Sequence, residues 1–230
     1  MRAIVLFSGG LDSTVCLADA VNRYGGDEVV ALTLYYGQKH SKELDSAGEV
    51  ARYYGVCHVV QDLASVFALS DSALLERSQN DIPQGTYADS TLKGDNGISK
   101  TYVPYRNGLF LSYAAAMAYS IGAEVIYYGA HADDSGNAYP DTSPDFVELQ
   151  DSTIQAGTGG LVRVHTPFVH STKADIVYHG IQLQVPFDLT WSCYEGREEA
   201  CGKCATCLDR IKAFEANGVK DPIGYERGTL

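Results

Sequence analysis

The segment Ala3–Ser13, which reads AIVLFSGGLDS, decides the fold of this chain. An apolar run is followed by two glycines and then by a helical pattern over Thr14–Val21, so we expect a buried strand that turns directly into a helix. The first N–H groups of a helix lack partners within it, and the helix dipole gives them partial positive charge. Glycines let an anion approach the backbone closely, and Ser8, Ser13 and Thr14 add hydroxyl donors. The segment therefore predicts an anion site at the end of the first strand.

The glycine loop differs from that of the common NTPases, because no Lys follows its second glycine. SGGLDS resembles instead the PP-loop of ATP pyrophosphatases, which cleave ATP between its α- and β-phosphates. A simple Gly-Gly turn between strand and helix is the alternative. Asp12 suits an anion cradle only if a metal ion or water separates its carboxylate from the phosphates. The resemblance implies that ATP is bound by Ser8, Gly9, Gly10, Leu11, Asp12, Ser13 and Thr14.

Length and charge restrict the class of protein. The 230 residues suffice for one α/β domain with a substantial core and a small appendage. A formal charge of −12 argues against direct binding to nucleic acid, which needs several phosphate-neutralising Lys or Arg contacts. The sequence shows neither a signal peptide nor an apolar run of about 20 residues. We therefore expect a cytoplasmic protein without a membrane span.

Strand and helix patterns alternate along the first 60 residues. Val29–Tyr36 is rich in β-formers, Ser41–Tyr54 has helical apolar spacing before the stop signal Gly55, and Val56–Val60 predicts a third strand. This alternation predicts an α/β fold with a doubly wound, mostly parallel sheet, whose ligands bind at the carboxyl ends of the strands.

The pattern breaks between Ser70 and Tyr102, where the sequence is polar and rich in turn residues, as in a functional lid or a disordered loop. We predict an ATP-binding α/β domain over residues 1–185, with this insertion, and a metal-binding helical tail over 186–230. Further helices are expected at Asn107–Gly122, Pro144–Gly157 and Thr172–Leu183, and strands at Glu124–Gly129 and Val162–Pro167.

Four of the six cysteines gather near the C-terminus with the spacing Cys193-x7-Cys201-x2-Cys204-x2-Cys207. In a reducing compartment this crowding predicts a metal site, and the two-residue spacings are typical of structural Cys₄ zinc. A [4Fe–4S] cluster and unligated thiols are the alternatives. The other two cysteines, Cys16 and Cys57, lie in apolar surroundings and are expected in the core.

The combined motifs resemble one family over nearly the whole chain, that of 7-cyano-7-deazaguanine synthase, in queuosine and archaeosine precursor synthesis. One departure is Thr142-Ser143, where members of the family usually carry Cys-Arg. The resemblance rests on SGGLDS (8–13), YGQKHSKEL (36–44), VPYRN (103–107), YPDTSPDF (139–146), STKADIV (171–177) and TWSCYEG with CGKCATCLDR (190–210).

This resemblance implies a PP-loop, adenine nucleotide alpha hydrolase-like fold and a reaction. ATP and Mg²⁺ activate 7-carboxy-7-deazaguanine, ammonia converts it to the amide, and a second activation yields the nitrile. It also implies a homodimer and catalytic roles for Asp12 and Lys173. The expected substrate-binding residues are Gln38, His40, Arg106, Asn107, His131, Asp133, Tyr139 and Asp141.

Each of these residues also has a purely structural interpretation. The guanidinium of Arg106 suits a carboxylate or phosphate but also a structural ion pair, and Asn107 could be a helix N-cap. Lys173 could be a solvated surface lysine, and Gln38 could stabilise a turn.

Three other functions remain open at this stage. A related ligase could stop at the amide or join the deazapurine acid to another amine. A PP-loop tRNA sulfurtransferase would carry an iron–sulfur cluster, and a nucleotide sensor would bind ATP without turnover. No separate glutaminase domain is visible, so free ammonia is the expected nitrogen donor.

Overall fold

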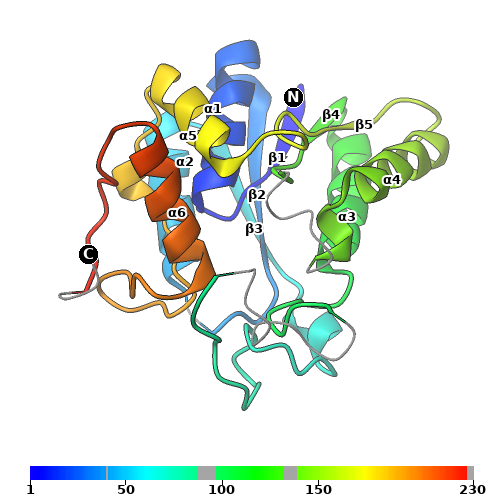
Figure 1. Ribbon diagram of the computed structural model, residues 1–230. Helices are drawn as coiled ribbons and strands as arrows, with labels where there is room; N and C mark the ends of the chain where they lie inside the picture. The colour runs from blue at the N-terminus through cyan, green and yellow to red at the C-terminus, as the bar shows by residue number, and fades with distance from the viewer. Residues whose placement is uncertain (40, 87–96, 132–138, 227–230) are drawn as a thin grey trace.

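The computed structural model describes residues 1–39, 41–86, 97–131 and 139–226. Five parallel strands form one sheet in the order β3-β2-β1-β4-β5 (Figure 1). This arrangement confirms the predicted doubly wound parallel sheet. The strands are β1 (Ala3–Leu6), β2 (Val29–Tyr35), β3 (Cys57–Asp62), β4 (Val125–Tyr127) and β5 (Arg163–His165).

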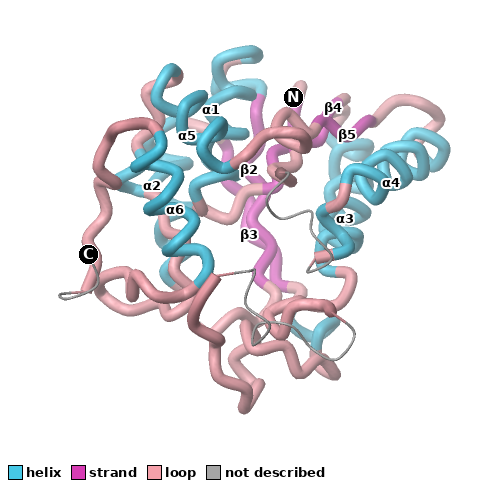
Figure 2. Tube along the Cα trace, in the orientation of Figure 1, coloured by secondary structure: helices cyan, strands magenta, loops and turns pink. Residues whose placement is uncertain are grey.

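Helices cover both faces of the sheet (Figures 1 and 2). One face carries α1 (Leu11–Tyr24), α2 (Lys42–Tyr54), α5 (Lys173–Gln182) and α6 (Ala205–Ala216). The other carries α3 (Arg106–Ile121) and α4 (Pro144–Gly157). No helix in the described part of the chain is long and apolar enough to cross a membrane. Single 3₁₀ turns are η1 (Gly26–Glu28), η2 (Ala64–Phe67), η4 (Pro140–Thr142) and η5 (Phe187–Leu189).

The helix ends follow the expected local signals. Gly55 and Gly122 adopt left-handed backbone conformations and end α2 and α3. Thr172 and Asp175 form a reciprocal capping box that begins α5. The observed bounds of α2, α3, α4 and α5 lie within one residue of the predicted ones, whereas α1 extends three residues beyond the predicted Thr14–Val21 at each end.

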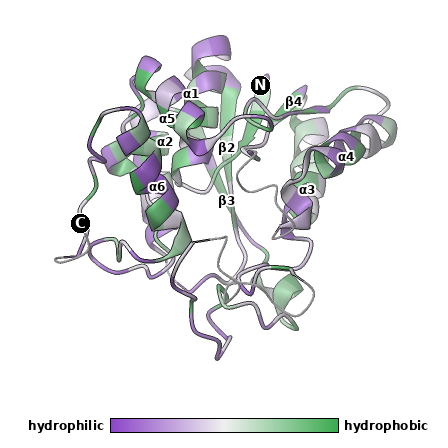
Figure 3. Ribbon diagram, viewed as in Figure 1, coloured by the Kyte–Doolittle hydropathy of each residue, from purple (hydrophilic) through white to green (hydrophobic). Residues whose placement is uncertain are grey.

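The core lies on both faces of β1, whose residues alternate between two apolar clusters. Ala3 and Val5 pack with residues of α1, α2, α5 and α6, whereas Ile4 and Leu6 pack against α3 and α4. A strand buried on both sides is a continuous apolar run, which explains the sequence AIVL. Figure 3 shows the hydrophobic residues gathered along the strands and the inner helix faces.

One core prediction is wrong. Cys16 is fully buried in α1, but Cys57 is exposed at the start of β3. The reason is that β3 is an edge strand of the sheet, and all of its residues are exposed or half-buried.

The described residues of the 70–102 insertion pack under the carboxyl end of β2. Leu74, Leu75 and Val103 form a small apolar cluster with Tyr36 and Phe67. Residues 87–96 lie outside the described part, so a closing motion of this loop stays a prediction.

The tail is anchored by a buried guanidinium. Arg210 of α6 is 1% exposed, and its Nε and Nη2 donate to the Asp221 carboxylate at 2.7 and 2.9 Å. Its other bonds reach Thr190 Oγ1 at 2.7 Å and the Phe187 carbonyl at 3.0 Å. Arg210 therefore fixes the segment that leads into the cysteines. The boundary between residues 1–185 and the tail stays a prediction.

Removing the carboxylate partner of Arg210 should cost far more stability than removing an exposed one. We expect Asp221→Ala to lower the free energy of unfolding by about 3–5 kcal/mol, because a buried charge loses its partner. The matched control is Glu124→Ala, which breaks the exposed ion pair with Arg2 and should cost less than about 1 kcal/mol. Urea unfolding of both variants measures the difference, and equal losses would contradict this role of Arg210.

Candidate active site

The glycine loop lies at the switch point of the sheet. The chain leaves β1 for β2 on one side, and β4 pairs with β1 on the other side. A crevice opens where the strand order reverses, and in α/β sheets this is where ligands bind. The loop Ser8–Gly10 joins β1 to α1 at this point, as the sequence predicted.

Gly9 holds the loop in a conformation that only glycine adopts easily. Its φ is +84°, and a Cβ there would lie 2.4 Å from the Glu43 carbonyl oxygen and 2.5 Å from the Ala47 nitrogen. On the opposite side, the Trp191 N–H donates to the Gly9 carbonyl at 3.0 Å. The loop is therefore held between α2 and the segment that follows η5.

The serine hydroxyls of the loop bond to one another, and no side chain caps α1. Ser13 Oγ accepts from the Ser8 N–H at 3.2 Å, and Ser8 Oγ accepts from the Gly10 N–H at 3.2 Å. The uncapped start of α1 thus faces a cavity with partial positive charge. Ser8, Gly10, Leu11, Asp12 and Ser13 line this cavity.

Thr14 does not join that lining. It is fully buried, and its Oγ1 donates to the Gly10 carbonyl at 2.8 Å. Its hydroxyl supports the loop from behind, so the structure does not bring it to the expected ATP contacts.

Asp12 meets two basic side chains at the base of the cavity. Its Oδ2 lies 3.4 Å from Lys173 Nζ and 3.7 Å from His131 Nε2. Lys173 is the first residue of α5 and is 7% exposed, so it is not a solvated surface lysine. Asp12 Oδ1 has no hydrogen-bond partner within the described residues. A carboxylate oxygen of this kind fits Mg²⁺, which prefers hard oxygen ligands.

Arg106 lies on the opposite wall, at the start of α3. Its guanidinium stacks over Tyr36 at 4.9 Å from the ring centre and lies 5.8 Å from that of Phe110. Its Nε and Nη2 donate to Asn107 Oδ1 at 3.4 and 3.3 Å, and it forms no ion pair among the described residues. The structural ion pair is therefore not observed, and a planar cation faces the cavity.

Asp141 caps α3 from a distant part of the chain. Its Oδ2 accepts from the Asn107 N–H at 3.0 Å, and its carbonyl accepts from Tyr128 Oη at 3.1 Å. Burial raises the pKa of Asp141, while the bond from Asn107 and the charge of Arg106 oppose that rise. The N-cap position itself is Tyr105, so the interpretation of Asn107 as N-cap is wrong.

Only some of the remaining expected substrate-binding residues line the cavity. Tyr139 lines the cavity, and its Oη lies 2.5 Å from Thr101 Oγ1. Gln38 also lines it, with Oε1 accepting from the Tyr36 N–H at 3.1 Å, as expected of a turn-stabilising residue. His131 lies behind Asp12 and is 1% exposed. The expected residues His40 and Asp133 lie outside the described part of the chain.

The departures from the family pattern have local structural roles. Ser143 is the N-cap of α4, where its Oγ accepts from the Phe146 N–H at 3.2 Å. Thr142 Oγ1 donates to the Tyr139 carbonyl at 2.9 Å and closes the turn before it. Together they shape the segment that delivers Asp141.

Sequence reasoning missed several cavity residues, namely Tyr36, Glu43, Phe110, Trp191 and Tyr194. Four of them belong to apolar or aromatic patterns that suggest only a core. All five except Phe110 nevertheless lie within motifs of the family resemblance, YGQKHSKEL (36–44) and TWSCYEG (190–196), so their place among the motif residues was the one available signal.

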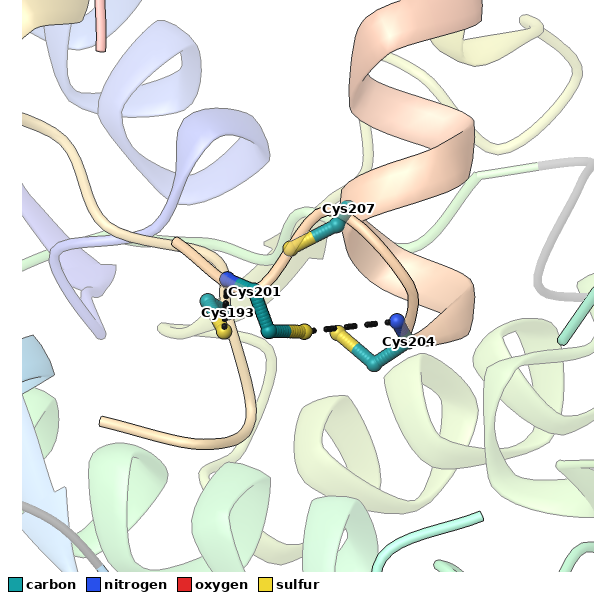
Figure 4. A group of neighbouring side chains, drawn as sticks. All are labelled: Cys193, Cys201, Cys204 and Cys207. Atoms are coloured by element: carbon teal, nitrogen blue, oxygen red, sulfur yellow. Dashed lines mark hydrogen bonds between the residues drawn. The ribbon is translucent and has the colours of Figure 1, made fainter. Parts of the chain in front are cut away.

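The four clustered cysteines form a buried second site (Figure 4). Their sulfur atoms all lie within 4.8 Å of one another. Two thiolates on one ion at bond lengths of about 2.3 Å lie at most about 4.6 Å apart, so sulfurs gathered within 4.8 Å need to move only slightly to share a single ion. Backbone N–H groups of Cys201 and Cys204 donate to the sulfurs of Cys193 and Cys201 at 3.3 and 3.4 Å. The predicted ligands can therefore hold one metal ion.

Comparison with known proteins identifies close relatives. Residues 2–218 match the family model described as "Queuosine biosynthesis protein QueC". The chain is 43% identical over 226 residues to 7-cyano-7-deazaguanine synthase of Caldicellulosiruptor bescii, covering 98% of each chain. It is also 43% identical to the synthase of Archaeoglobus fulgidus, covering 97% of this chain and 90% of the relative.

The fold also resembles a solved structure. NMN synthetase from Francisella tularensis superposes with a TM-score of 0.53 at 15% identity, over 95% of this chain and 78% of that one. At this identity the likeness extends to the fold alone.

The cysteine cluster makes a direct prediction about metal content. We expect the purified protein to contain about one metal ion per chain, and Cys204→Ser to lose it and melt at a lower temperature. The matched control is Cys57→Ser, because Cys57 is exposed and lies outside the cluster. Elemental analysis measures the metal content, and thermal melting measures the stability. A wild-type chain without metal whose melting temperature equals that of Cys204→Ser would contradict the assignment.

Proposed function

The chain belongs to the QueC family of 7-cyano-7-deazaguanine synthases, and on that premise we propose how its cavity makes this nitrile. The proposal rests on one observation above all. The cavity is lined both by the start of α1, which attracts anions, and by the guanidinium of Arg106, which forms no ion pair among the described residues. A nucleoside triphosphate and an organic acid can therefore meet inside it.

The PP-loop end binds the triphosphate of ATP. Backbone N–H groups at the start of α1 and the hydroxyls of Ser8 and Ser13 face the phosphates. Lys173 adds a positive charge where pyrophosphate develops its negative charge as it leaves. Asp12 would hold Mg²⁺, which when bound neutralises phosphate charge. Asp12 also orients Lys173 through their contact at 3.4 Å.

The opposite end binds the deazapurine acid. A guanidinium presents paired donors that suit a carboxylate. The ring of Tyr36 holds the guanidinium of Arg106 in place. Phe110 and Tyr139 add aromatic surface on which a flat heterocycle can rest. Asn107 and Asp141 fix the first turn of α3 and thereby the position of Arg106.

Activation solves the chemical difficulty of the reaction, because a carboxylate is a poor electrophile. An acid oxygen attacks the α-phosphorus of ATP, pyrophosphate leaves, and the resulting acyl adenylate carries AMP as a good leaving group. Ammonia displaces AMP to give the amide. The amide oxygen then attacks a second ATP, and loss of AMP with the two N–H protons leaves the nitrile.

The cofactor and the setting are also part of the proposal. The Cys₄ site would hold Zn²⁺ with all four positions filled by protein, so this ion is structural. Free ammonia is the nitrogen donor, and the enzyme acts in the cytoplasm as a homodimer. The charge of −12 favours a small-molecule substrate over tRNA.

The decisive experiment is mass spectrometry of a reaction that contains the purified protein, ATP, Mg²⁺, ammonium and 7-carboxy-7-deazaguanine. We expect the nitrile as the final product, with two AMP formed for each. Amide as the only product would favour the ligase that stops there, and no turnover of this acid would contradict the proposal.

The proposed PP-loop can be tested at Gly9. Gly9→Ala should reduce ATP–pyrophosphate exchange with the acid at least about 100-fold, because a Cβ cannot fit against α2 and the loop must shift. The matched control is Gly25→Ala. Gly25 has the same φ of +84°, but a Cβ there meets nothing within 4 Å. Equal exchange rates in the two variants would contradict the role of Gly9.

A further inference from the structure

Glu43 is a carboxylic acid that lines the cavity and has no part in the proposed binding of ATP and the deazapurine acid. It lies in the first turn of α2, where its own carbonyl packs against Gly9 of the PP-loop. Its side chain is half-buried and lines the cavity between the PP-loop and Arg106. Within the described residues, its carboxyl group makes neither a hydrogen bond nor an ion pair shorter than 4 Å.

Each of the other two carboxylates that line the cavity is engaged through Oδ2, while its Oδ1 has no hydrogen-bond partner among the described residues. Asp12 contacts Lys173 and His131, and Asp141 caps α3 through Asn107. Among the described lining residues, Glu43 is therefore the carboxyl group that is held by neither a hydrogen bond nor an ion pair and can exchange a proton with a bound substrate.

Its surroundings bring its titration close to neutrality. Burial raises the pKa of Glu43 to about 7, and the positive charge of Arg106 from α3 opposes that rise. The other titratable group that faces it is Tyr36 after β2, whose pKa burial raises to about 12, so that the phenol stays neutral. A carboxyl group that titrates near pH 7 is well matched to proton transfer at neutral pH.

The proposed reaction has steps that need such a group. When the nitrogen of ammonia bonds to the acyl carbon and the C–O bond to AMP breaks, one N–H proton must leave to give the neutral amide. When the adenylated amide loses AMP, its two N–H protons must leave to give the C≡N bond. Formation of the acyl adenylate itself releases no proton from the acid, because the acid enters as a carboxylate.

We infer that Glu43 is the general base that accepts protons from the substrate nitrogen. The inference rests on the proposed function and goes beyond it by assigning the proton transfers to one carboxyl group, that of Glu43. The reacting carbon is that of the carboxylate held by Arg106, and one oxygen of this carboxylate must reach the α-phosphate held by the PP-loop. Glu43 faces both elements, because its backbone packs against Gly9 of the PP-loop and its carboxyl group interacts with the charge of Arg106, whereas Asp12 belongs to the loop and Asp141 caps α3.

The test separates the half-reactions. ATP–pyrophosphate exchange with the acid, in the absence of ammonium, measures adenylation alone, and amide formation under single turnover measures the ammonia step. We expect Glu43→Gln to keep exchange within about twofold and to slow amide formation by about 10²–10⁴-fold. The matched control is Glu49→Gln, an exposed glutamate on the same helix, which should leave both rates unchanged.

Three outcomes would overturn the inference: an unchanged rate of amide formation in Glu43→Gln, a loss of exchange as large as the loss of amide formation, or a similar effect of Glu49→Gln. If Glu43→Gln does not fold by thermal melting, Glu43→Asp is measured in the same way. That variant keeps the base but moves it, so amide formation should again fall more than exchange, and an equal fall would count against the inference. Absence of exchange in the wild-type chain would instead contradict the proposed function.

Discussion

The close packing of Gly9 against α2 is the constraint on which the rest of the site depends. Gly9 has no side chain with which to hold the loop, so other elements hold it from outside. Two distant segments do this: the backbone of Glu43 and Ala47 on one side, and the N–H of Trp191 on the other. The anion-binding geometry is therefore a tertiary property, although its sequence is local.

The same packing links the cysteine tail to the PP-loop. Trp191 lies two residues before Cys193, and its indole N–H donates to the Cys193 carbonyl at 3.0 Å. Lys42 of α2 lies 3.8 Å from the centre of the Trp191 ring, while Arg210 holds the neighbouring Thr190. A metal ion held by the four cysteines would order the tail and thereby also the segment that supports the PP-loop. A short tail with little core of its own obtains much of its folding energy from such an ion.

Local patterns in the sequence were sufficient to predict the strands, the helices and the parallel sheet, because apolar periodicity and glycine stops act within a few residues. Cys57 was misplaced because nothing local shows that its strand lies at the edge. The PP-loop, Lys173 and the cysteines were found through motifs, whereas the capping of α3 by Asp141 depends on a contact across 34 positions. Glu43 could not be singled out, since its importance comes from burial beside Arg106 and Tyr36 and not from its helix pattern.

We propose that the cavity transfers the adenylyl group of ATP to the substrate oxygen. This transfer is measured by following the oxygens of 7-carboxy-7-deazaguanine labelled with ¹⁸O in its carboxylate. Every AMP formed on the way to the nitrile is expected to carry one labelled oxygen, and pyrophosphate is expected to carry none. Label in phosphate or pyrophosphate, or in water with unlabelled AMP, would contradict it.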